Sequence, residues 1–301
     1  MFSTLKLLGT LSPGERKTIL SGQFAGDFTA DALLDQMRAL ARFDASNDAA
    51  RDRIKRLTVI SVIFAIATTW LGFNQLLVVI PGFDALARPL PFAIAGLSVA
   101  CFIALLVLKR RLTSVDISNN FRDVALPFLA VLKQDIDPDQ LLSVRIDLRS
   151  PTHERKRRDS SHPAAKGRYT KIVETNYHDP WFHGAARLAD GSVLRWGVTE
   201  DICKSERTKR SASNKLKTKT RHYKRSAVAI SLAVPNKSYG VNAGLQSSRH
   251  KVSVEKGAKR GTIKLTRKIK SKSLDALDPR VLIDAVSSAY KRVAAPARSA
   301  A

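Results

Sequence analysis

Lys and Arg residues at alternate positions indicate that parts of this chain can bind anions. The segment 215–221 reads KLKTKTR, so Lys or Arg occupies every second position. Because the side chains of a β-strand alternate between its two faces, a strand here places all four cations on one face. A later segment, 264–270, has similar even spacing. We therefore predict anion-binding positions on two strands, namely Lys215, Lys217, Lys219, Arg221, Lys264, Lys268 and Lys270.

The excess of positive charge is confined to one part of the chain. The 301 residues include 51 Lys and Arg against 26 Asp and Glu, a net charge of +25. Residues 1–108 hold 10 against 8, and residues 151–272 hold 30 against 9. Three interpretations stay open: solvated strand faces that resist edge-to-edge pairing, docking on anionic lipid headgroups, and binding of nucleic acid or another polyanion. No recognition motif accompanies the third, which rests on aromatic residues that can stack on bases, Tyr169, Tyr177, Trp196 and Tyr223.

A membrane-tethered enzyme is the contrasting hypothesis, and its candidate residues lie in one short segment. His178, Asp179 and His183 are near enough in sequence to suggest a metal site or a general base. Zinc would need a third protein ligand, and Pro180 makes a shared helical face improbable. The sequence also lacks a Gly-rich phosphate-binding loop. We therefore expect neither a metal nor a cofactor, and we assign no catalytic residue.

The two cysteines are too few and too far apart for a disulfide framework or a Cys-based zinc site. Cys101 lies in an apolar run and Cys203 in a basic segment, which fits a reducing compartment. Lys204 follows Cys203, and a neighbouring cation would lower the pKa of the thiol. Without a partner histidine, nucleophilic chemistry at Cys203 has no further support.

The basic region has the pattern of antiparallel strands. Residues 142–148 alternate apolar and polar, and Asp190-Gly191 is a hairpin turn signal between apolar runs. Strands at roughly ten-residue spacing predict a sandwich or barrel. A helix from Asp278 to about Val293 closes the chain. The candidate strands after residue 150 are 171–178, 181–188, 193–203, 215–224, 227–234, 251–255 and 262–270.

Two uncharged apolar runs predict a transmembrane hairpin. Residues 57–80 and 90–108 are each near the roughly 20 residues that a membrane-spanning helix needs. Basic clusters at 51–56 and 109–111 flank the pair, so the Lys/Arg bias places both termini in the cytoplasm, at a bacterial inner membrane. Small residues at helical spacing favour packing between the two helices over dimerisation, although a homo-oligomer stays possible; they are Ser61, Ala65 and Thr69 in the first run, and Gly96, Ala100 and Ala104 in the second.

The sequence thus predicts an α+β membrane protein in four parts. Residues 1–56 form an N-terminal cytoplasmic segment, loosely ordered up to residue 27, with an amphipathic helix that Thr29 caps. The hairpin covers 57–108, and a helical linker with a kink at Pro127 covers 109–141. The basic β-rich domain covers 142–301. Its predicted role is binding or scaffolding at the inner membrane surface, with lipid or another protein as partner.

Overall fold

The computed structural model describes residues 9, 11–73, 89–165, 167–242, 244 and 247–294. The chain forms two compact units. One consists of residues 1–16 and 40–116, and the other of residues 17–39 and 117–301. The predicted α+β class is confirmed, because long helices are followed by an antiparallel sheet and a C-terminal helix.

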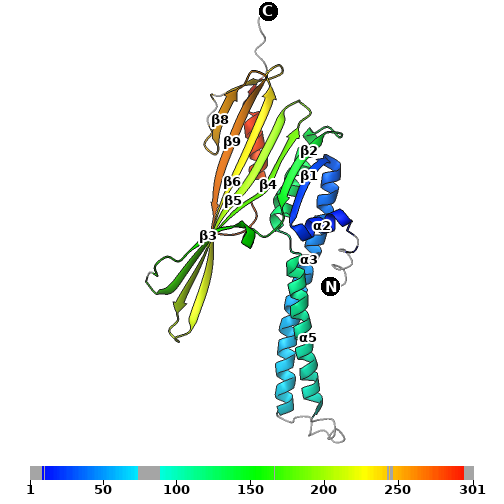
Figure 1. Cartoon of the computed structure of the whole chain (residues 1–301), viewed down its shortest axis with the longest axis vertical. Coiled ribbons are helices and arrows are strands. Elements are labelled where there is room, and N and C mark those ends of the chain that lie inside the picture. The colour runs from blue at the N-terminus through cyan, green and yellow to red at the C-terminus, as the bar shows by residue number, and fades with distance from the viewer. Residues whose placement is uncertain are drawn as a thin grey trace, which may run out of the picture. The chain divides into compact units, whose positions relative to one another are not determined.

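Two long antiparallel helices dominate the first unit: α3 (Ala30–Phe73), which begins in the other unit, and α5 (Pro89–Ser114) (Figure 1). Asn47 Nδ2 donates a hydrogen bond to the carbonyl of Leu112 at 3.2 Å. Further along the pair, Ser61 Oγ donates to the carbonyl of Ser98 at 2.9 Å. Between these bonds, Ile54 packs in a buried apolar cluster with Leu112.

The small residues of the two helices behave differently. Ser61, Ala65 and Thr69 are half-buried, as expected for a face that packs on a partner helix. The corresponding residues of α5 are exposed, and Ser98 takes their place against α3. The predicted packing through Gly96, Ala100 and Ala104 is therefore wrong. Spacing alone identifies a stripe of small residues but not the direction in which it faces.

One helix of the described residues is long and apolar enough to cross a membrane, Ala93–Ser114, and only 6% of its most apolar window is buried. It overlaps the second predicted span. The first predicted span, 57–80, coincides with the end of α3 as far as Phe73, and residues 74–80 lie outside the described residues. The hairpin therefore stays a prediction.

The second unit is built on one open sheet of eight strands, in the order β1-β2-β4-β5-β6-β9-β8 with β3 paired to β4. Every pairing in it is antiparallel. The sheet strands are β1 (Gln23–Thr29), β2 (Leu141–Asp147), β3 (Arg157–Ser161), β4 (Tyr169–Arg187), β5 (Val193–Arg210), β6 (Leu216–Pro235), β8 (Lys251–Lys256) and β9 (Arg260–Ser271). A separate two-stranded sheet joins β7 (Gly240–Val241) to β10 (Val293–Ala294). The predicted sandwich or barrel is wrong, because the sheet neither closes nor packs on a second sheet of comparable size.

Helices cover one face of this sheet. α7 (Arg280–Tyr290) packs on β6 and β9, and Phe128 of α6 (Leu126–Leu132) makes edge contacts with Phe182 and Trp196. A π-helix, Phe121–Ala125, precedes α6, so the helical segment is divided just before Pro127, as predicted. Two 3-10 turns, Lys133–Asp135 and Glu154–Lys156, complete the helical elements. The other sheet face carries polar and small residues.

The three central strands are longer than predicted, with 19, 18 and 20 residues in β4, β5 and β6. β4 joins two predicted strands through a register shift between Asp179 and Phe182, where a bulge accommodates Pro180. β6 likewise joins two predicted strands. β3 and the adjoining halves of the three long strands extend beyond the part of the sheet that the helices cover (Figure 1). We call this extension, residues 157–178 and 203–223, the projection.

The N-terminal segment is more ordered than predicted. α2 (Pro13–Ser21) is followed by β1, whose register with β2 pairs Gln23 with Asp147 and Thr29 with Leu141. Thr29 caps α3 as predicted, since the backbone N–H of Ala32 donates to Thr29 Oγ1. The expectation of loose order up to residue 27 is wrong from residue 13 onward. Only Phe24 of β1 is fully buried, so the strand has little apolar alternation to reveal it.

Candidate anion-binding site

The register of the sheet brings the predicted cations to a single face. Arg225 of β6 lies opposite Lys270 of β9, Ala227 lies opposite Lys268, and Lys264 follows further along the same pairing. Opposed residues share a face, as do alternate residues of one strand. The cations of the first half of β6 therefore lie on the same face as those of β9. Sequence spacing predicted two cationic strands, and the pairing makes them one surface, which we call the cationic face.

Six of the seven predicted cations have no carboxylate partner within the described part of the chain. The exception is Lys264, whose Nζ lies 2.6 Å from Oε1 of Glu255 on β8. Lys215 lies one residue before β6, in the exposed turn. Residues 212–221 are all exposed, so the first half of β6 has solvent on both sides. The cationic face thus presents charge that the protein itself leaves largely uncompensated.

Like charges oppose each other across the projection. Lys217 of β6 pairs with Lys209 of β5, and Lys219 pairs with Arg207. Directly opposed like charges destabilise a sheet. Arg207 partly relieves this repulsion, because its guanidinium lies 5.8 Å from the centre of the Tyr169 ring. Such crowding is the arrangement expected where an external anion supplies the missing counter-charge.

A pocket of about 630 Å³ opens where the projection joins the covered sheet. Two rungs of the ladder line it with residues of the cationic face, and the rung between them, Tyr177, Ile202, Lys224 and Ser271, lines it from the covered face. In the first, Asn176, Cys203 and Tyr223 stand side by side on β4, β5 and β6. In the second, Arg225 lies between Asp201 of β5 and Lys270 of β9. The pocket therefore combines residues of the cationic face with residues of the covered face, and of its cations sequence spacing predicted only Lys270.

The pocket lining is predominantly cationic. Five cations contribute to it, Arg158, Lys224, Arg225, Lys270 and Lys272, against two carboxylates. Lys224 is buried and compensated, since its Nζ lies 3.3 Å from the buried Oε1 of Glu200. Asp201 is engaged by His178, with Nδ1 and Oδ1 2.7 Å apart. The other four cations have no ion pair among the described residues.

The thiol in this pocket is not activated. Burial raises the pKa of Cys203, and the nearby carboxylates of Glu174 and Asp159 raise it further. Lys204 is the next residue on the strand, and it forms an ion pair with Glu206 at 2.7 Å. Because successive strand residues point to opposite faces, its ammonium group lies on the other side of the sheet. The expected lowering of the Cys203 pKa by Lys204 is therefore wrong.

His178, Asp179 and His183 are not brought together. His178 engages Asp201, whereas Asp179 is buried on the other side of β4, with Oδ1 2.9 Å from Nζ of Lys156. Burial raises the pKa of Asp179 to about 7, although the charge of Lys156 opposes the shift. His183 lies beyond the bulge, and burial lowers its pKa. These three side chains belong to separate contacts, so the geometry gives the enzyme hypothesis no support.

The four candidate stacking residues also differ in role. Trp196 is buried in the core between Phe128 and Phe182, so it is unable to stack on a base. Tyr177 is largely buried as well. Tyr223 is 39% exposed at the pocket, and Tyr169 lies on the projection beside Arg207. Two of the four rings therefore remain available to a ligand.

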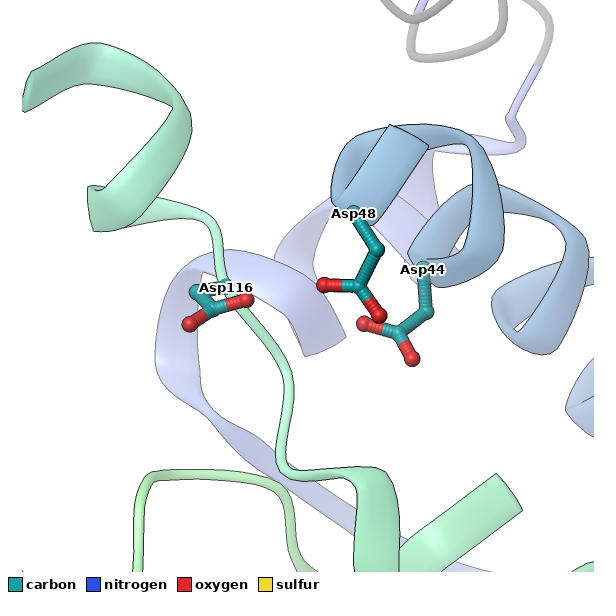
Figure 2. Close-up of side chains that lie close together, drawn as sticks. All are labelled: Asp44, Asp48 and Asp116. Atoms are coloured by element: carbon teal, nitrogen blue, oxygen red, sulfur yellow. The ribbon is translucent and has the colours of Figure 1, made fainter. Parts of the chain in front are cut away.

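An acidic trio that the sequence analysis did not single out lies in the first unit. Oxygen atoms of Asp44, Asp48 and Asp116 lie within 4.8 Å of one another, and Figure 2 shows the three carboxylates converging from α3 and from the segment after α5. Arg51 forms ion pairs with Asp116 and, at 3.6 Å, with Asp48. A guanidinium thus supplies much of the positive charge that a metal ion would bring. In the sequence, only the spacing of four residues between Asp44 and Asp48 indicated that two of these carboxylates lie on one helix face.

Comparisons of the chain with protein-family models, with curated protein sequences and with solved structures find no match. The functional argument therefore rests on the geometry of the chain itself.

Proposed function

We propose that this protein is anchored in a membrane by α3 and α5 and binds anionic lipid headgroups through its cationic face. The observation that carries the proposal is the shared face of the β6 and β9 cations, six of the seven predicted positions having no carboxylate partner among the described residues. A Lys or Arg close to an anionic leaflet contributes about 1 kcal/mol of binding free energy. A row of such residues on one face therefore gives substantial affinity.

The exposure of apolar side chains on the two helices supports the anchor. Large patches of this kind on a protein surface mark contact with a membrane or another protein. The most exposed members are Val59, Ile60, Ile63, Ile66 and Trp70 on α3, and Leu97, Val99, Ile103 and Val107 on α5. Contact with lipid hydrocarbon accounts for side chains that face outward from a helix pair.

The charges at the ends of the helices support one orientation. The bond from Asn47 to the Leu112 carbonyl brings the two basic flanks, 51–56 and 109–111, to the same end of the helix pair. Flanks rich in Lys and Arg stay on the cytoplasmic side. We infer that the sheet domain is cytoplasmic and that its cationic face meets the anionic inner leaflet.

The test compares two triple variants of the full chain with equal net charge. The first is Lys217→Gln, Lys219→Gln, Arg221→Gln, on the cationic face. The control is Lys237→Gln, Lys256→Gln, Lys259→Gln, at exposed positions near the far ends of β6, β8 and β9. Each protein is inserted into phosphatidylcholine nanodiscs, and its binding to added vesicles is measured with and without phosphatidylglycerol as salt is raised.

We expect the first variant to lose affinity for phosphatidylglycerol vesicles by on the order of 100-fold at low salt, from three contacts of about 1 kcal/mol each. The control should bind like the wild type, and salt should weaken both. Equal loss in the two variants would reduce the effect to net charge and refute the proposal. Preferential binding of a single-stranded oligonucleotide over the vesicles, abolished by Tyr169→Ala and Tyr223→Ala, would assign the face to nucleic acid instead.

A further inference from the structure

We infer that the pocket between the projection and the covered sheet is a discrete binding site for a ligand carrying two or more phosphate groups. The site shares Arg225 and Lys270 with the cationic face, but it is a hollow that residues from both faces of the sheet line. It goes beyond the proposed function, because an open pocket of about 630 Å³ has room for one compact ligand, whereas a flat cationic strand only attracts a surface.

The charge around the pocket identifies the ligand as an anion of more than one charge. Arg158 contributes from β3, Arg225 from β6 and Lys270 from β9, so the cations approach from different strands. Lys272 follows β9 and completes the set. Cations gathered around one hollow repel each other unless an anion lies between them. A single carboxylate or monophosphate would engage only part of this set.

A second hollow supports a ligand with separated anionic groups. It has a volume of about 440 Å³ and is lined by Thr220, Arg221 and His222 together with Tyr223 and Lys272. The last two residues line both hollows. Two phosphates on one molecule match this arrangement, with one near Arg225 and Lys270 and the other near Arg221. Asn176 and the hydroxyl of Tyr223 add neutral hydrogen-bonding groups.

The same phosphate chemistry can come from a soluble molecule or from a lipid headgroup. Inorganic pyrophosphate represents the first source, and cardiolipin, with two phosphates in one headgroup, represents the second. The binding assay therefore uses both probes on the full chain in a zwitterionic detergent or in phosphatidylcholine vesicles. Vesicles of phosphatidylcholine with and without cardiolipin form the lipid arm.

Cys203 provides a reporter inside the pocket. It is half-buried, and it becomes the sole thiol of the chain in a Cys101→Ser background. The rate at which neutral N-ethylmaleimide alkylates Cys203 is measured at constant ionic strength as each probe is added. A bound ligand shields the thiol, so the rate should fall by about tenfold when the probe concentration is ten times its Kd.

Two double variants test whether the pocket cations bind the probe. Arg225→Gln with Lys272→Gln should raise the Kd of the probe, measured from protection, by on the order of 100-fold, because two charged hydrogen bonds are lost. Lys237→Gln with Lys259→Gln, which removes equal charge far from the pocket, should leave protection unchanged. Arg225→Lys with wild-type Lys272 should retain most of it. Similar alkylation rates in the free variants would show that the pocket itself is intact.

The outcomes separate this inference from the proposed function. Protection by pyrophosphate, by cardiolipin vesicles or by both supports the site and identifies its source of phosphate. Protection should persist in a Lys217→Gln, Lys219→Gln variant, which keeps Arg221, even where attachment to phosphatidylglycerol vesicles is weakened. The inference would be overturned if neither probe protects Cys203, or if the Arg225, Lys272 variant is protected as well as the wild type. Either result would leave the proposed function intact, because vesicle binding tests that function separately.

Discussion

Individual charged residues in this sheet have two different environments. On the covered side, Lys156 and Lys224 are buried and each is matched to a carboxylate, Asp179 and Glu200. On the open side, the predicted cations are exposed. Alternation in the sequence predicted the second group, since period two defines a strand face. It was unable to predict the buried pairs, because their partners lie on different strands or segments and only long-range register brings them together.

The raised pKa of Asp179 makes stability depend on pH. The folded protein holds a proton there up to about pH 7, whereas the unfolded chain releases it near the ordinary value of 3.8. The free energy of unfolding therefore falls as pH rises through this window, by up to about 1.4 kcal/mol per pH unit. Asp179→Asn removes this dependence, so the variant should gain stability relative to the wild type from pH 4 to about pH 7.

Urea unfolding at several pH values, followed by fluorescence of the buried Trp181 and Trp196 with Trp70→Phe in the background, measures this difference. Asp147→Asn serves as a control, because the pKa of Asp147 is shifted in the opposite direction to that of Asp179. Burial acts to raise the pKa of Asp147, but hydrogen bonds from Arg149 and the charge of Lys156 outweigh it and lower the pKa. That variant should lose stability relative to the wild type as pH rises towards 3.8, and the difference should stay constant above that pH. A difference in free energy of unfolding between Asp179→Asn and the wild type that is the same at all pH values would contradict the prediction.

At the scale of elements, sequence patterns located most strands but divided the long ones. Alternation of apolar residues marks a strand only where one face is buried. In the projection both sides of β6 are exposed, so no apolar period connects residues 216–223 to the buried residues 228–234. In β4, the two predicted strands stop on either side of Asp179 and Pro180, and the bulge that joins them depends on pairing with β5. Pairing order likewise decides between an open sheet and a sandwich.

Close packing where β2, β4 and β5 meet depends on Gly184. A Cβ atom at this position would overlap the Trp196 ring and lie 2.7 Å from the carbonyl oxygen of Ser143. Gly184→Ala should therefore lower the free energy of unfolding by about 1–3 kcal/mol, as overpacking does in other cores. Urea unfolding followed by tryptophan fluorescence measures the change. Ala229→Ser, on the exposed face of β6, adds one heavy atom and should change stability by less than about 0.5 kcal/mol.

For the whole molecule, the sequence predicted the division between an apolar helical part and a basic sheet part. Among the described residues one helix, Ala93–Ser114, is long and apolar enough to cross a membrane, and the proposed anchor rests on it together with the exposed apolar side chains of α3 and α5. Composition alone gave this division, because long uncharged runs are rare outside membranes and protein cores. The β1 strand was missed, since a segment from before α3 pairs with a strand more than a hundred residues later.

Membrane anchoring predicts that the expressed full chain sediments with membranes and resists an alkaline carbonate wash. Ile63→Asp, Ile66→Asp and Ile103→Asp together should release it, because each Asp near the middle of a spanning helix costs about 3 kcal/mol. The control is Leu20→Asp, Leu141→Asp and Leu216→Asp, three equally exposed apolar residues outside the anchor. It should stay with the membrane. A wild-type chain that is a compact monomer in detergent-free buffer would contradict the prediction.

The opposed cations of the projection have a consequence for how that part of the chain is held together. Lys209 lies opposite Lys217, and Arg207 lies opposite Lys219. The repulsion between these like charges weakens the pairing of β5 with β6. An anion bound beside these residues would screen the repulsion and so stabilise the hairpin that β5 and β6 form. If the proposed anion binding holds, the stability of these rungs should therefore increase with the concentration of a multivalent anion.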